Sequence, residues 1–263
     1  MVFHAGLHKT GTTSLQQSLA AHAGALGPDI HVATRKTSAA LSLAAGRARD
    51  WSILRDAEAT TNLATALRDW AAGLELAPGK MLLASSEDFA GHMPGNRGLS
   101  DYSAAPVLAR AIADALFARF ADLELHFLYT TRDPEPWLRS LHWQLARHPM
   151  LELSAQKFAR RYAKAAEFAP LIARIGAALP GIAVTAIPLE SLASRRLGPV
   201  EAIYDLARLD EDRRAALPVG AAARKSPPHD LADAFVALNR AGIAPALLAR
   251  MKAALIAESE AAR

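Results

Sequence analysis

The sequence predicts an α/β fold in which a parallel central sheet is flanked by helices. Short apolar runs alternate along the chain with segments whose hydrophobic residues recur at the spacing of a helix. Strands that alternate with helices in this way form βαβ units and a parallel sheet. The chain has 263 residues, which is enough for one full α/β domain or at most two small ones. We expect a single domain over residues 1–263.

Short apolar runs along the chain have the length and composition of strands. The runs that begin at Met81 and Leu125 are almost entirely apolar, as expected for strands that are covered on both faces. The predicted strands are Val2–Ala5, Ile30–Ala33, Met81–Ala84, Leu125–Thr130 and Ile182–Ile187.

The segments between and after these strands show helical periodicity. Leu15 and Leu19 stand one turn apart in the first of them. Asp133 is a suitable N-cap, and Pro134 then takes the first helical position, where its missing N–H costs nothing. The predicted helices are Thr13–Ala25, Leu54–Leu74, Ala104–Phe120, Pro134–Arg147, Ser154–Leu179 and Asp230–Ala257.

Composition and charge exclude several classes of protein. The chain has no cysteine, which excludes disulfides, cysteine-ligated zinc and thiol nucleophiles. Abundant arginine explains a net charge of +4, and no helix-turn-helix or zinc-finger pattern indicates binding to nucleic acid. No apolar run reaches the roughly 18 residues that a membrane span needs. We therefore expect a cytoplasmic protein without a membrane span, whose oligomeric state the sequence leaves open.

The segment that joins the first strand to the first helix has the features of a phosphate-binding loop. It reads Gly6-Leu7-His8-Lys9-Thr10-Gly11-Thr12-Thr13-Ser14. The backbone N–H groups of such a turn and the positive end of the helix dipole point at one place, where hydroxyls add further donors. Lys9 supplies a mobile positive charge there. The loop is not a Walker A motif, because Lys9 precedes Gly11 instead of directly following a glycine.

This loop resembles the 5′-phosphosulfate-binding loop of the sulfotransferases that use 3′-phosphoadenosine-5′-phosphosulfate (PAPS). The resemblance implies a P-loop nucleotide-kinase-like sulfotransferase fold, PAPS as co-substrate, adenosine 3′,5′-bisphosphate (PAP) as product, and no metal. It also implies that Lys9 contacts the oxygen that bridges phosphate and sulfate, and that it stabilises the leaving phosphate as the S–O bond breaks. The residues it implies for donor binding are Gly6, His8, Lys9, Thr10, Gly11, Thr12, Thr13 and Ser14.

A second motif follows the predicted strand at 125–130. Arg132 stands at the carboxyl edge of the sheet, where ligands bind in open α/β folds, and Ser140 follows eight residues later. This spacing is similar to that of the family's 3′-phosphate-binding motif. A guanidinium can grip a phosphate with two parallel hydrogen bonds, and the hydroxyl adds a third. Taken singly, a salt-bridged helix start at Arg132–Asp133 and a neutral serine within a helix explain these residues equally well.

A late basic segment is the third similarity. Family members close the site with a basic loop that touches the 3′-phosphate, and Arg224-Lys225-Ser226 stands at the corresponding place in the chain. A solvated basic loop before a helix explains this segment equally well. The resemblance covers the two phosphate motifs and the alternating pattern, which together extend over residues 1 to 240.

The general base is expected at the end of the third strand. The acceptor must lose a proton as it attacks sulfur, and a carboxylate or a histidine removes it best. Glu87 and Asp88 follow the apolar run at 81–84. Family members use either histidine or glutamate, and no histidine stands at this strand end, so the resemblance favours Glu87. His92 in the next loop is the rival base and His8 a second rival, while a plain carboxylate at a helix start explains Glu87 equally well.

The loop at 91–102 is expected to form part of the acceptor wall, together with Trp143. Its contributing residues are His92, Met93, Asn96, Arg97 and Tyr102. His4 alternates with apolar residues on the first strand, and we expect it in the core or behind the site. The nine histidines show no metal-ligand spacing, and no acidic strand end is suited to hold Mg²⁺.

The sequence therefore predicts transfer of a sulfuryl group from PAPS to a hydroxyl or amine of a small-molecule or glycan acceptor that it does not identify. The alternatives are a P-loop small-molecule kinase that uses ATP and Mg²⁺, and a non-catalytic nucleotide-binding protein. The displaced Lys9 and the Arg132–Ser140 spacing favour the sulfotransferase over the kinase. The presence of Lys9 and Glu87 gives no support to the non-catalytic alternative, which stays open.

Overall fold

The computed structural model describes residues 1–220 and 229–261. The chain divides into two compact units. The first comprises Met1–Arg132 and Phe168–Ala222, and the second comprises Asp133–Glu167 and Ala223–Arg263. Compact units within one domain and two separate domains would both give this division. The single domain expected over residues 1–263 therefore stays a prediction.

The first unit is built on one five-stranded sheet, in the order β2-β3-β1-β4-β5. All four neighbouring pairs are parallel. The predicted α/β class with a parallel central sheet is therefore confirmed. The strands are β1 (Val2–His4), β2 (Ile30–Thr34), β3 (Met81–Ser85), β4 (His126–Thr131) and β5 (Ala183–Pro188).

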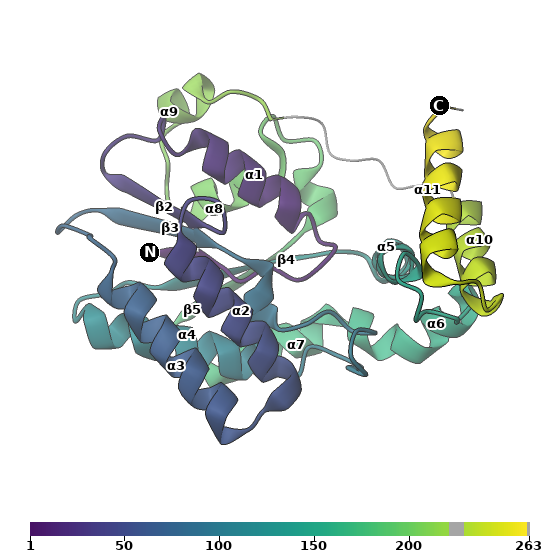
Figure 1. Ribbon diagram of the computed structural model, residues 1–263. Coiled ribbons are helices and arrows are strands. Elements are labelled where there is room, and N and C mark those ends of the chain that lie inside the picture. Colours follow the sequence, from purple (N-terminus) through teal and green to yellow (C-terminus); the bar gives the residue numbers. More distant parts are fainter. Residues whose placement is uncertain (221–228, 262–263) are drawn as a thin grey trace. The chain divides into compact units, whose positions relative to one another are not determined.

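Helices cover both faces of this sheet, as Figure 1 shows. On one face, α1 contacts β2 while α8 contacts β1 and β4; on the other, α2 and α3 pack together, α3 packs on α4, and α4 on α7. The helices of this unit are α1 (Thr12–His22), α2 (Ala39–Leu54), α3 (Ala57–Ala72), η1 (Glu87–Ala90), α4 (Ala105–Arg119), α7 (Phe168–Ala178), η3 (Leu189–Leu192), η4 (Gly198–Val200), α8 (Glu201–Leu206) and α9 (Glu211–Ala216).

The two faces of the sheet have different cores because successive side chains of a strand point to opposite sides. Val2 packs with Leu15 and Leu19 of α1. Phe3 points the other way, and its ring meets those of Trp70, Phe89 and Phe127 at centroid distances of 5.9, 5.4 and 5.6 Å. This packing anchors the short strand β1 in the middle of the sheet.

The helix predicted at Leu54–Leu74 begins in the wrong place. Arg55 adopts a left-handed conformation at the end of α2, and the side chain of Asp56 then caps α3 by accepting a bond from the N–H of Ala59 at 2.7 Å. The preceding helix α2 was not predicted. Its buried face carries small side chains, which give little hydrophobic contrast along the sequence: Leu41, Ala44, Ala45, Ala48 and Ser52.

The second unit is helical. Its elements are α5 (Pro134–Ala146), α6 (Ala155–Tyr162), η2 (Ala163–Ala166), α10 (His229–Arg240) and α11 (Pro245–Ala261). The predicted helix at 154–179 is thus divided into α6, η2 and, in the first unit, α7. The predicted helix at 230–257 is interrupted between α10 and α11, where Gly242 has a positive φ of 64°. Both interruptions were missed because hydrophobic periodicity continues across them.

A partly buried amide–ammonium pair ends helix α5. The amide nitrogen of Asn239 donates to the carbonyls of Ala146, His148 and Leu151, at 3.3, 3.0 and 2.6 Å. Its oxygen accepts from the Nζ of Lys252 at 2.6 Å, and this ammonium also donates to the Ala146 carbonyl at 2.8 Å. The terminal carbonyls of a helix need such donors, so this pair closes α5.

We expect Asn239→Asp to destabilise the second unit by roughly 1–3 kcal/mol, because it replaces donors that face carbonyl oxygens with an acceptor. Amide hydrogen exchange in α5 and α10, with thermal unfolding alongside, measures the loss. Gln156→Glu is the matched control, since it adds the same charge at an exposed position in the first turn of α6. Equal behaviour of the two variants would contradict the assigned role.

Candidate functional site

The loop between β1 and α1 leaves the start of the helix ready for an anion. Gly11 is the N-cap of α1, and it makes no side-chain cap bond to the first N–H groups. Lys9 and Gly11 both have left-handed backbones, with φ of 67° and 88°. A Cβ at Gly11 would also lie 2.6 Å from Leu189. The turn therefore requires glycine there, and the first N–H groups of α1 are left without a side-chain cap from Gly11.

The predicted loop residues divide by their burial into two groups. Thr10 is fully buried, and its hydroxyl donates to the carbonyl of Leu7 at 2.7 Å. Thr12 is 4% exposed, whereas Thr13 is exposed and Ser14 is half-buried. The side chain of Thr10 thus shapes the loop, while those of Thr13 and Ser14 have access to a ligand.

Gly6 makes room for the return of the loop. A Cβ at this position would lie 2.7 Å from Cε1 of His4 and would overlap the methyl group of Thr12. The sequence assigned Gly6 to donor binding on the strength of the resemblance. Its close contacts give it a steric role beneath the loop.

Arg132 and Glu87 reach the loop and its helix from neighbouring strands. Arg132 follows β4, and its guanidinium Nη1 donates to the carbonyl of Lys9 at 3.2 Å. Glu87 follows β3, and its carboxylate accepts a bond from the side-chain amide of Gln16 on α1. Because β3 and β4 flank β1 in the sheet, the two side chains approach from opposite sides.

Asp88 forms ion pairs with two arginines. Its carboxylate, whose side chain is 5% exposed, lies 3.1 Å from Arg35 and 3.7 Å from Arg49. Burial raises the pKa of this carboxyl, and the charge of Arg49 opposes that rise. Of the two carboxylates at this strand end, Glu87 is therefore the one left to face the site.

His8 packs inward instead of facing solvent. It is 9% exposed and stacks on the ring of Tyr102, whose hydroxyl accepts a bond from the His8 backbone N–H at 3.2 Å. Burial lowers the pKa of the His8 imidazole, and the nearby Glu87 carboxylate opposes this. His92 and the positive charge of Lys9 lower this pKa further.

His92, the rival base, is held at its backbone by α2. Its N–H donates to the hydroxyl of Ser52 at 3.0 Å, and the Asn96 amide lies 3.4 Å from its Nδ1. Burial lowers the pKa of His92, and the charges of Arg49 and Arg97 lower it further. A neutral imidazole at neutral pH is able to accept a proton.

The structure does not test the place of some predicted site residues at this loop. Ser140 lies on α5 in the second unit, and its part in a phosphate clamp stays a prediction. Arg224 and Lys225 lie outside the described residues. Gln16 and Thr130 contact site residues but were not predicted. Thr130 carried a usable signal, since it is a hydroxyl residue that follows the apolar stretch of β4 and stands two positions before Arg132.

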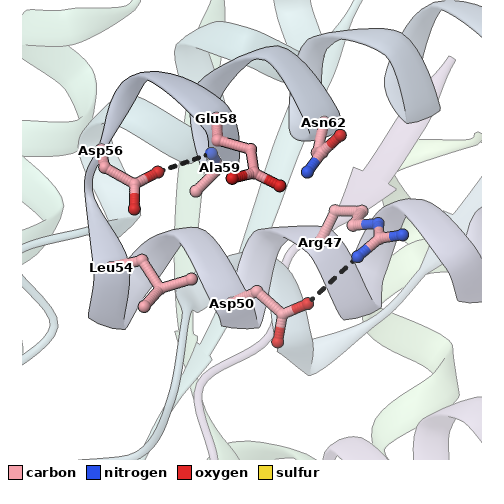
Figure 2. A pocket seen from close by; sticks show the side chains of 7 residues that line it. All are labelled: Arg47, Asp50, Leu54, Asp56, Glu58, Ala59 and Asn62. Carbon is pink, nitrogen blue, oxygen red and sulfur yellow. Dashed lines mark hydrogen bonds and ion pairs between the residues drawn. The ribbon is translucent and has the colours of Figure 1, made fainter.

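A separate pocket of about 180 Å³ lies between α2 and α3, away from these residues (Figure 2). Three of its charged side chains already have partners: Arg47 lies 3.6 Å from Asp50, and Asp56 caps α3. In residues 1–220 and 229–261, no group of three or more His, Asp or Glu side chains is placed to hold a metal ion. No helix within the same residues is both long and apolar enough to cross a membrane.

No protein-family model matches the chain, and no curated protein matches it significantly. Among solved structures, the chain is similar to the crystal structure of a sulfotransferase from Alicyclobacillus acidocaldarius. The sequence identity is 18%, the match covers 90% of this chain and 91% of that chain, and the TM-score is 0.45. A likeness at this level leaves the function to be argued from the site itself.

The stability of the protein should fall as the pH drops from about 6.5 towards 4. Burial lowers the pKa of the His4 imidazole from 6.5 to about 4, so in this range the unfolded chain binds a proton that the folded chain excludes. We expect His4 to contribute a loss of roughly 3 kcal/mol, measured by urea unfolding across this range. His4→Gln should flatten the dependence, and a slope equal to that of the wild type would contradict the assignment.

Proposed function

We propose that the protein transfers a sulfuryl group from PAPS to a hydroxyl or amine of an acceptor, which is a small molecule or a glycan. The observation that carries this proposal is the bonding of Arg132 and Glu87 to the two sides of one loop–helix segment. A sulfuryl donor with phosphates at two positions needs cations around one loop. The acceptor needs a base on the side of the loop away from these cations. Glu87, which bonds Gln16 of α1, is proposed for this place.

The donor would bind over the start of α1. Its 5′-phosphosulfate would accept bonds from the backbone N–H groups that follow Gly11 and from the hydroxyls of Thr13 and Ser14. The acceptor oxygen would form a bond to sulfur as the bond from sulfur to the bridging oxygen breaks. The negative charge that develops on the leaving phosphate would be stabilised by the ammonium of Lys9.

Arg132 would bind the 3′-phosphate. A guanidinium presents five N–H donors in a planar fork that matches the geometry of a phosphate, and Arg132 lies beside the loop, where its Nη1 donates to the Lys9 carbonyl. The sequence spacing adds Ser140, and the late segment adds Arg224 and Lys225, as further partners of this phosphate. Such a clamp distinguishes PAPS from ATP, which has no 3′-phosphate.

Glu87 would remove the proton from the acceptor. The bond from Gln16 orients its carboxylate, and a base must be oriented before its basicity counts. His92 is the second candidate, because the low pKa caused by burial and by Arg49 keeps its ring neutral. The same reaction results from either base.

The nucleotide choice is tested by thermal shift. PAP at concentrations well above its dissociation constant should raise the melting temperature, and ATP with Mg²⁺ should raise it much less. Arg132→Ala should weaken PAP binding tenfold to a hundredfold, since a charge-assisted bond contributes about 1.5–3 kcal/mol. Affinity for adenosine 5′-phosphosulfate, which lacks the 3′-phosphate, should fall by a clearly smaller factor, because that ligand loses only the support that Arg132 gives to the loop. Stronger stabilisation by ATP–Mg²⁺ would favour a kinase.

The roles of Lys9 and Glu87 are separated by kinetics. Lys9→Ala should lower kcat far more than it weakens PAP binding, because the charge it stabilises develops in the transition state. Glu87→Gln should lower kcat by about 10²–10⁴ and leave PAP affinity unchanged. Single-turnover rates with labelled PAPS and PAP titrations measure both. If Glu87→Gln keeps near-normal turnover with an alkyl alcohol while His92→Ala loses it, His92 is the base.

A further inference from the structure

A continuous chain of buried hydrogen bonds runs beneath the phosphate loop. It begins at Ser85, whose hydroxyl lies 2.8 Å from Nδ1 of His4. Nε2 of the same ring lies 3.2 Å from the hydroxyl of Thr130, which lies 2.9 Å from that of Thr10. The chain ends where Thr10 bonds the Leu7 carbonyl. The four side chains are fully buried, so water does not compete for these bonds.

The direction of every bond in this chain follows from its last acceptor. A carbonyl only accepts, so the single hydroxyl proton of Thr10 is donated to Leu7. Thr130 must then donate to Thr10, which leaves its oxygen to accept from His4. Nε2 of His4 therefore carries the proton, and Nδ1 accepts from the hydroxyl of Ser85. One tautomer of a neutral imidazole satisfies the whole chain.

The two ends of the chain adjoin the two halves of the proposed active site. Thr10 stands directly after Lys9 in the loop. Ser85 is followed by Ser86, whose N–H donates to the backbone carbonyl of His4 at 3.1 Å, and then by Glu87. His4 therefore holds the start of the Glu87 segment through its backbone and its ring, and it holds the Lys9 segment through Thr130.

We propose that His4 is a positioning residue, which sets the placement of Lys9 relative to Glu87 through this chain. The proposal rests on the proposed function for the roles of Lys9 and Glu87. It assigns His4 no contact with the substrate. The burial that lowers the pKa of His4 keeps the ring neutral, and this preserves the acceptor nitrogen that Ser85 needs.

The chain can be cut on either side of His4. Thr130→Val keeps the side-chain shape but removes the link to the loop, so PAP should bind roughly tenfold more weakly. Thr130→Ser keeps the hydroxyl and should restore binding. Ser85→Ala cuts the other side, so it should leave PAP affinity unchanged and lower kcat about tenfold or more by displacing Glu87.

The same sheet provides a matched control. Nε2 of His126, the first residue of β4, lies 2.7 Å from the hydroxyl of Thr185 on the neighbouring strand β5. Thr185→Val removes the same kind of bond, so it should lower the melting temperature and leave both PAP affinity and kcat unchanged. If Thr130→Val changes PAP affinity no more than Thr185→Val does, His4 is only a structural residue and the proposal is wrong.

Two readouts do not depend on activity. Long-range ¹H–¹⁵N spectra should show the Nε2–H tautomer of His4, and the Nδ1–H tautomer would overturn the proposal. Exchange of the Lys9–Gly11 amides should accelerate in Thr130→Val and not in Ser85→Ala. If Thr130→Val does not fold, unchanged kcat in Ser85→Ala would still overturn the proposal. Failure of the wild type to bind PAP would remove the proposed function and leave the tautomer and exchange results as the test of His4.

Discussion

The structure depends on one constraint, the return of the phosphate loop over the end of the short strand β1. The loop must pass so close to the strand that a Cβ at Gly6 would lie 2.7 Å from the His4 ring. At that depth polar groups are costly unless each finds a partner. The chain from Ser85 to Thr10 meets this requirement without any charged group. The loop is therefore held from below by polar, uncharged side chains that are all hydrogen-bonded.

Charged side chains lie next to this neutral chain at the same edge of the sheet. Asp88 is nearly as buried as the neutral chain, but its two partners, Arg35 and Arg49, have side chains that are 45% and 39% exposed. Burial still raises the pKa of the Asp88 carboxyl, and the charges of Arg49 and Arg35 oppose that rise. The central place of β1 then separates the remaining charges, with Arg132 towards β4 and Glu87 towards β3. A donor and an acceptor would approach from these two sides.

The strands were predictable to within one residue, because each is a short run of mostly apolar or β-branched residues that contrasts with its surroundings. The helices were predicted less accurately, since α2 was missed and the start of α3 was misplaced. Alanine on the buried face hid α2, and the break at Arg55 depends on one backbone conformation. The sequence showed that this loop has the residues of a phosphate-binding loop. It did not show that the Thr10 side chain turns inward to bond Leu7 and Thr130. Its partner Thr130 is 120 positions away, and sequence spacing carries no information on such a contact.

The left-handed backbone of Lys9 connects this support to the chemistry. A residue other than glycine in that conformation costs on the order of 1–2 kcal/mol, so it persists only where its neighbours hold it. Its carbonyl is held by Arg132, and the next residue, Thr10, is held by Leu7 and Thr130. Loss of either anchor would let Lys9 relax towards an ordinary conformation and move its ammonium. The buried chain thus keeps a strained lysine in the place where the proposed reaction needs its charge.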